Sequence, residues 1–170
     1  MYYQTVQQFI RTLKNLDAIL EKAIAHAAKH KFDVNNFCGA RLFPDMLPFT
    51  SQIRIACDHA KNLAANLSGR EAPRHEDNET TMEELRGRIG KCLAYLQTFS
   101  AADFARTTSE NVVKLTNPAG KTLLADEYVF MRQIPNFYFH TSIAYALLRK
   151  GGVEIGKGDF IGQLPVRDPA

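Results

Sequence analysis

The sequence contains no tryptophan, only three cysteines and no long apolar run. Cys38, Cys57 and Cys92 are odd in number and include no Cys-x-x-Cys pair. They therefore favour unpaired, mostly buried thiols in a reducing cytoplasm over a disulfide framework. No apolar segment approaches the roughly 20 residues that a membrane-spanning helix needs. The opening MYYQTVQQFIRTLK lacks the basic segment and apolar core of a signal peptide. We expect a cytoplasmic protein with no membrane partner.

Strong charge and familiar catalytic motifs are also missing. The formal net charge is +3, and Lys and Arg occur among acidic residues without forming a basic run. This pattern excludes an extended nucleic-acid-binding surface. There is no Gly-x-Ser-x-Gly elbow and no P-loop, and the glycine pattern GKGDF near the end is too short to indicate phosphate binding. With 170 residues, the chain is long enough for one domain, 1–170, with a core that needs no disulfide or metal.

Apolar residues recur at intervals of three and four in the first half of the chain, which predicts two amphipathic helices. The first is expected over residues 4–29. The second is expected to begin with Asp45 as its N-cap and Pro48 in its first turn, and to end near Ser68 and Gly69. The segment that follows, SGREAPRHEDNETT, is polar and has no apolar period, which predicts a surface linker.

The second half predicts two further helices and one hairpin. Thr80 or Thr81 should cap the third helix, because each has a glutamate three residues later. ENVVKL and KTLLA flank TNPAG, which predicts a β-hairpin near residues 111–125. The last helix should begin in ADEYVFMRQI, kink or restart at Pro135 and end at the glycine pair 151–152. The fold class is therefore all-α, a four-helix bundle with a small β-hairpin before the last helix and at least one connection that crosses the bundle.

Polar residues beside the apolar stripes are the candidates for a site. His59 lies beside the stripe of the second helix, and Gln52 and Asn66 lie one heptad on either side of it, which predicts a polar seam along that edge. On the last helix, Asn136 and His140 are four residues apart and share a face. These residues are either ligands of one site or packing residues that hydrogen-bond internally.

The other histidines and Asp58 are weaker candidates for a site. His26 and His30 lie at the polar end of the first helix and are expected to be solvated, and His75 is expected to be exposed in the linker. Asp58 should meet solvent or Lys61. The aromatic run that includes Tyr138 is expected to fill the core or wall a pocket; Tyr138 and Gln52 are the candidates for contact with a small molecule.

Four segments resemble a known family: GARLFPDM, QIRIACDHAK, PNFYFHTSIAYALLRKGG and IGKGDFIG. Together they make the chain similar to an uncharacterised bacterial branch of the DinB-like superfamily, over nearly its whole length. The resemblance implies a four-helix bundle, often a homodimer, with a metal between helices in the better-known relatives. Those relatives take one histidine from the second helix and a His-x-x-x-His pair from the last.

Carried over residue by residue, the resemblance places the metal ligands at His59, His140 and Asn136. Asn136 stands where the relatives have the first histidine of the pair, so two imidazoles and an amide replace three imidazoles. One function that follows is a degenerate enzyme dependent on a divalent metal such as Zn or Ni, thiol-transferase-like or hydrolytic. The alternative is a protein without a metal, a non-catalytic small-molecule-binding or stress-associated bundle in which the polar trio is structural.

Overall fold

Helix α1 (Tyr2–His30) forms the longest side of the bundle in this computed structural model, which describes residues 1–168. The predicted stripe is buried along its whole length. The helix ends at Lys31, whose left-handed backbone (φ 57°, ψ 45°) directs its N–H back to the carbonyl of Ala28. The predicted range 4–29 is confirmed within two residues at each end.

Helix α2 (Phe49–Ser68) begins later than the sequence predicted. Asp45 does not cap it; Pro48 occupies the N-cap position in an extended conformation (φ −70°, ψ 166°). The first two N–H groups of the helix, those of Phe49 and Thr50, instead donate to carbonyls of the preceding loop. Backbone oxygens of the loop satisfy these donors, so no capping side chain is needed.

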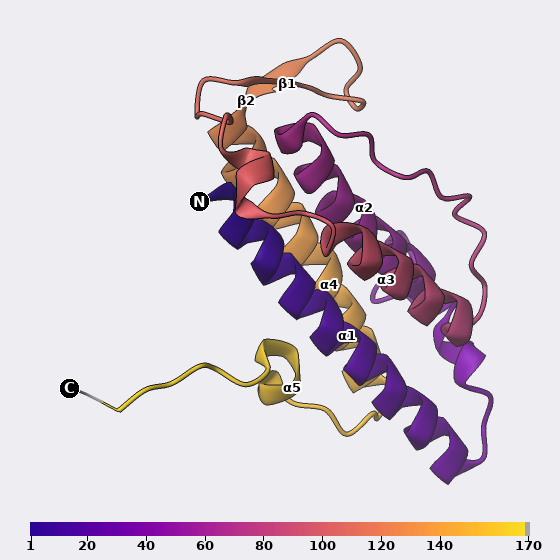
Figure 1. Cartoon of the computed structure of the whole chain (residues 1–170). Coiled ribbons are helices and arrows are strands. Elements are labelled where there is room, and N and C mark those ends of the chain that lie inside the picture. Colours follow the sequence, from indigo (N-terminus) through magenta and orange to yellow (C-terminus); the bar gives the residue numbers. More distant parts are fainter. Residues whose placement is uncertain (169–170) are drawn as a thin grey trace.

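Helix α3 (Met82–Leu96) begins at Thr81, where the predicted capping box with Glu84 is confirmed. The Met82 N–H also donates to Oδ1 of Asn35, a residue of the first loop, at 2.9 Å. The start of α3 therefore lies at the same end of the bundle as the start of α2. Linker 69–81 runs back along the outside, so α2 and α3 point in the same direction (Figure 1). This is the expected connection that crosses the bundle.

The hairpin and the last helix follow at the opposite end. Strands β1 (Val112–Lys114) and β2 (Thr122–Leu124) pair antiparallel, as predicted. The next segment is a π-helix, η3 (Glu127–Gln133), which the sequence did not reveal, and it continues directly into α4 (Ile134–Lys150). Two short 3-10 turns, η1 (Val34–Phe37) and η2 (Ala101–Phe104), and the short helix α5 (Lys157–Ile161) complete the element order.

The four long helices bury one continuous hydrophobic core, and the predicted all-α bundle with a hairpin before its last helix is confirmed. Cys38, Cys57 and Cys92 are all buried and unpaired, as expected. Within residues 1–168, no helix combines the length and apolar character needed to span a membrane.

Candidate functional site

Three hydrogen-bonded pairs join α2 to η3 and α4, and we call them the polar seam. Gln52 pairs with His140 (2.8 Å), His59 with Gln133 (2.5 Å) and Asn66 with the hydroxyl of Tyr128 (2.7 Å). On α2 the three residues are one heptad apart, so they share a face, as the sequence predicted.

The opposite side of the seam shows why the π-helix matters. Its members His140, Gln133 and Tyr128 are separated by seven residues and then by five. Five residues would not return to the same face of an α-helix. In a π-helix, whose hydrogen bonds join residues five apart, they nearly do. The wide turn of η3 therefore keeps Tyr128 and Gln133 on the face that meets α2.

Both seam histidines hold their proton on the same ring nitrogen. The Nδ1–H of His140 donates to Gln52 Oε1, whose orientation is fixed because Gln52 Nε2 donates to the Leu47 carbonyl at 2.9 Å. The Nδ1–H of His59 donates to Gln133 Oε1 in the same way. Each imidazole thus leaves the lone pair of its Nε2 free, which is the arrangement of histidines that bind metals.

Burial keeps these imidazoles neutral. Burial, together with the smaller effect of the neighbouring His59, lowers the pKa of His140 to about 4. Burial also lowers the pKa of His59, although its hydrogen bond with Gln133 opposes the effect. Both side chains are therefore uncharged near neutral pH and able to donate an electron pair.

The structure brings His59 and His140 together, but it places the other candidates differently. The two rings are nearly parallel, with centres 6.1 Å apart. Asn136 is half-buried and its Nδ2 donates to the Arg132 carbonyl at 2.7 Å, closing the junction between η3 and α4 beside Pro135. Tyr138 points the other way, toward Thr12 of α1, because residues two apart on a helix do not share a face.

The donors available to a divalent ion here are two imidazoles and one amide. In a tetrahedral site, Zn–N bonds of about 2.0–2.1 Å place the centres of two ligating imidazoles about 5.2 Å apart. The observed 6.1 Å is longer, so the two rings would have to move closer to share one ion. Asn136 can add only a neutral amide oxygen. Within residues 1–168 there is no group of three or more His, Cys, Asp or Glu that could hold a metal. The residues fit a weakly held ion completed by water or substrate, not a closed structural zinc site.

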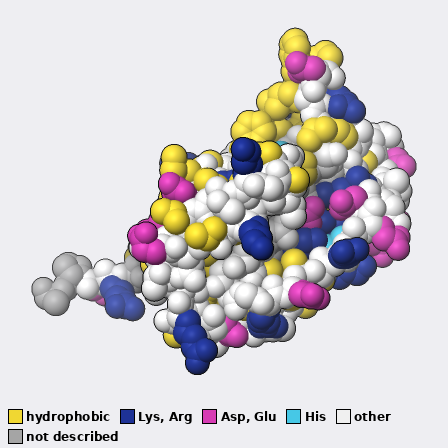
Figure 2. All heavy atoms as spheres, turned by 90° about the horizontal axis from the view of Figure 1, so that it is seen from above, with side chains coloured by type: hydrophobic (Ala, Val, Ile, Leu, Met, Phe, Trp, Pro, Cys, Tyr) yellow, Lys and Arg dark blue, Asp and Glu magenta, His cyan; other side chains and the backbone are white. Residues whose placement is uncertain are grey.

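Sequence reasoning missed a second polar cluster, which joins α2, α3 and the linker and which we call the Arg88 cluster. Its centre is the fully buried guanidinium of Arg88, and its other members are Arg54, Asp58, Lys61, Asp77 and Glu79. On this side of the molecule, Figure 2 shows acidic and basic side chains side by side around a hollow. Arg88 lies between Leu85 and Cys92 on the apolar stripe of α3, a position that could have identified it.

This cluster corrects two expectations about the linker side. His75 is partly buried, not exposed, because the ion pairs pin the linker against the bundle; burial, and then the positive charge of Arg88, lower its pKa. Asp58 does meet Lys61 (2.8 Å), as expected, but it also binds Arg88. On α1, His30 is exposed as expected, while His26 is half-covered by Phe32.

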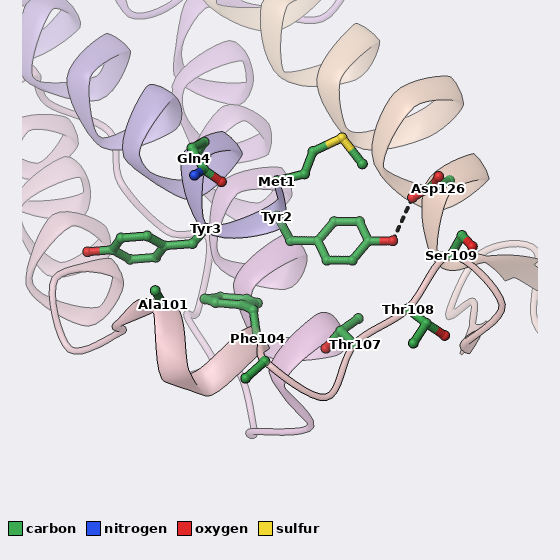
Figure 3. A pocket seen from close by; sticks show the side chains of 11 residues that line it. Met1, Tyr2, Tyr3, Gln4, Ala101, Phe104, Thr107, Thr108, Ser109 and Asp126 are labelled. Atoms are coloured by element: carbon green, nitrogen blue, oxygen red, sulfur yellow. Dashed lines mark hydrogen bonds between the residues drawn. The ribbon is translucent and has the colours of Figure 1, made fainter.

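A hollow of about 530 Å³ lies elsewhere, between the start of α1 and segment 101–109 (Figure 3). Its principal polar contact is the Tyr2 hydroxyl donating to Asp126 at 2.5 Å. Burial and this hydrogen bond raise the pKa of Tyr2 to about 12, so the hydroxyl remains protonated and is no nucleophile. The hollow lacks the histidines of the seam and is not the candidate site.

Comparisons with known proteins identify this helical bundle as DinB-like. The crystal structure of a DinB family member from Shewanella denitrificans, solved at 1.83 Å, has a TM-score of 0.92 and 44% sequence identity, over 99% of this chain and 95% of that one. A family described as a domain of unknown function, DUF1993, matches residues 1–161, and the chain belongs to it. A search of curated proteins gave no match.

Proposed function

We propose that this DinB-like protein binds a divalent transition-metal ion, Zn or Ni, through Nε2 of His59 and His140, and that Asn136 adds at most a weak amide ligand. One observation carries the proposal: both imidazoles donate from Nδ1 to a buried glutamine and leave Nε2 free. Such second partners fix the tautomer and orientation of metal-binding histidines. Gln52 and Gln133 have that role here.

The corresponding reaction class is metal-dependent chemistry on a small molecule, of a hydrolytic or thiol-transferase type. A bound ion supplies a Lewis acid that polarises a substrate or activates water or a thiol. The chain itself supplies two neutral imidazoles, two glutamines that orient them, and a largely buried setting that limits access of water.

A second candidate function is a non-catalytic, small-molecule-binding bundle in which the seam is structural. The three pairs favour it, since each joins α2 to η3 or α4 by a direct hydrogen bond between side chains. Buried polar networks of this kind can fix the register between helices without any ligand. Metal affinity separates the two candidates.

The experiment is calorimetric titration of Zn(II) and Ni(II) into wild type, Asn136→His, Asn136→Ala and Asn136→His with His59→Ala. His26 and His30 share one face of α1, with ring centres 4.2 Å apart, and could bind the added metal themselves. All four proteins therefore carry His30→Ala as a common background, and 'wild type' here means the chain with this change alone. Wild type should bind weakly. Asn136→His should bind at least about tenfold more tightly, since it adds a third imidazole.

The controls make the result specific. Asn136→Ala loses the amide without gaining a ligand and should show no increase in affinity. The gain in Asn136→His should disappear when His59 is also removed. Equal binding by wild type and Asn136→His, or a gain that survives the loss of His59, would refute the metal site and leave the structural role.

We further propose that the protein acts as a homodimer in the cytoplasm. Three unpaired, buried cysteines support the compartment. Phe130, Met131 and Phe139 of η3 and α4 are 44%, 75% and 54% exposed, and this apolar surface supports association of two copies.

A further inference from the structure

A pocket of about 200 Å³ lies beside the polar seam, between α2, β1 and η3. Its lining includes two basic side chains, Lys114 from β1 and Arg132 from η3, and no acidic one. The remaining polar residues that line it carry amides or hydroxyls: Asn62, Asn66, Gln133, Thr116 and Tyr128. The pocket therefore combines positive charge with neutral hydrogen-bonding groups.

The two basic residues of the pocket differ from three arginines of α2 and α3 in their ion pairing. Among residues 1–168, no ion pair includes Lys114 or Arg132. By contrast, Arg54, Arg86 and Arg88 each lie within 3.0 Å of a carboxylate oxygen. Arg132 is also half-buried, so its charge has lost part of its hydration without gaining a counter-ion.

The pocket borders the seam, because three seam residues, Asn66, Tyr128 and Gln133, line it together with Arg132. Gln133 connects the two places directly, because it lines the pocket and accepts the Nδ1–H of His59.

We propose that this pocket binds a small anion, a molecule carrying a carboxylate or phosphate group, between Arg132 and Lys114. The planar fork of an arginine fits both groups. The volume admits only a small molecule or the charged end of a larger one. The anion would lie one side chain from His59, so it would be the substrate, or part of the substrate, of the proposed site. This assignment of a substrate class rests on the proposed function.

The test uses malonate and inorganic phosphate as probes, titrated into metal-free protein at low ionic strength and followed by amide NMR spectra. Malonamide, which has the shape of malonate without its charge, is the control ligand. Malonate or phosphate should shift the signals of Lys114, Arg132 and Gln133, with affinity that falls as salt is added. The tighter of the two probes identifies the preferred head group. If neither anion binds, or if malonamide binds as well as malonate, the proposal is wrong.

Two variants locate the charge. Arg132→Gln should weaken anion binding about tenfold or more, the usual effect of losing a hydrogen bond to a charged group. Lys114→Gln should weaken it less, because this side chain is exposed. Arg106→Gln and Lys121→Gln remove the same charge from exposed positions outside the pocket and should leave binding within twofold. Equal losses in all four variants would show a nonspecific charge effect and overturn the assignment.

The outcomes separate this inference from the metal proposal. Anion binding is measured without metal, so it can succeed if the histidine pair binds no ion. It can also fail while Asn136→His still gains zinc affinity. The comparison of malonate with malonamide needs only the wild-type protein, so it stands even if Arg132→Gln does not fold.

Discussion

Replacement of Arg88 by methionine should strongly destabilise the fold. The Arg88 Nη1 lies 2.8 Å from Asp77 and 3.0 Å from Glu79, and its Nη2 lies 2.8 Å from Asp58. The cluster contains three cations and three anions, so it is balanced. Methionine fills much of the same space but leaves one uncompensated negative charge among partly buried groups.

The expected magnitude follows from burial. Removing one partner of a buried ion pair costs about 3–5 kcal/mol, against a total stability of about 5–15 kcal/mol for a domain. The Arg88 side chain is fully buried, while those of Glu79, Asp58 and Asp77 are 13%, 29% and 51% exposed, so the lower half of that range is expected. For a chain of this size, each kcal/mol shifts Tm by roughly 2–4 °C.

Arg86→Met is the matched control. Arg86 lies on the same helix and makes two hydrogen bonds to Asp17, but both side chains of this pair are 32% exposed. An exposed pair contributes about 0–1 kcal/mol. Urea unfolding followed by circular dichroism, with equal slopes for all variants, measures the difference. A loss in Arg88→Met no larger than that in Arg86→Met would refute the reasoning.

Acid should weaken the same cluster. Burial alone would raise the pKa of Glu79, but its backbone hydrogen bond and the contact with Arg88 outweigh burial and lower it. A carboxylate with a lowered folded-state pKa contributes stability above its ordinary value of 4.5, and that stability is lost as the pH falls below it. Wild type should therefore lose more stability than Arg88→Met in this range.

Three further predictions concern other parts of the fold. Gly90→Ala should stabilise α3 by about 0.5–1 kcal/mol, because nothing lies within 4 Å of the added methyl group. Gly151→Ala should destabilise the protein, because its methyl group would lie 2.3 Å from the ring of Phe37. Thermal melting should show a higher Tm for the first variant and a lower Tm for the second. Stability should fall between pH 6.5 and about 4, where the unfolded chain protonates His140 and the folded chain does not, and the fall should be smaller in His140→Gln when measured by urea titration across pH. Light scattering should show a dimer for wild type and a monomer for Phe139→Glu; a wild-type monomer at micromolar concentration would contradict the proposed homodimer.

Apolar periodicity was sufficient to predict the helices because each one buries a single stripe. The capping box at Thr81 was equally readable, since its signal is local. The start of α2 was not, because carbonyls from the first loop replace the capping side chain that Asp45 was expected to supply. That contact depends on how the loop folds back and leaves no mark in the local sequence.

The candidate site was likewise predictable only in part from the sequence. Heptad spacing on α2 predicted that Gln52, His59 and Asn66 would form a seam. Their partners Gln133 and Tyr128 were missed, because a spacing of five residues reads as two different faces unless the helix is known to be a π-helix. Hydrogen bonds five residues apart cannot be read from a pattern of residue types.

Asn136 stands where DinB-like relatives are expected to have a histidine, and it makes a structural contact of its own. Its Nδ2 donates to the Arg132 carbonyl at 2.7 Å, one turn earlier, and so ties α4 to the end of η3. Arg132 in turn lines the proposed anion pocket. An imidazole at position 136 would add a stronger ligand to the proposed metal site, but it would remove the amide that holds the Arg132 carbonyl. If both proposals hold, asparagine at this position reduces donor strength toward a metal and supports the basic wall of the anion pocket.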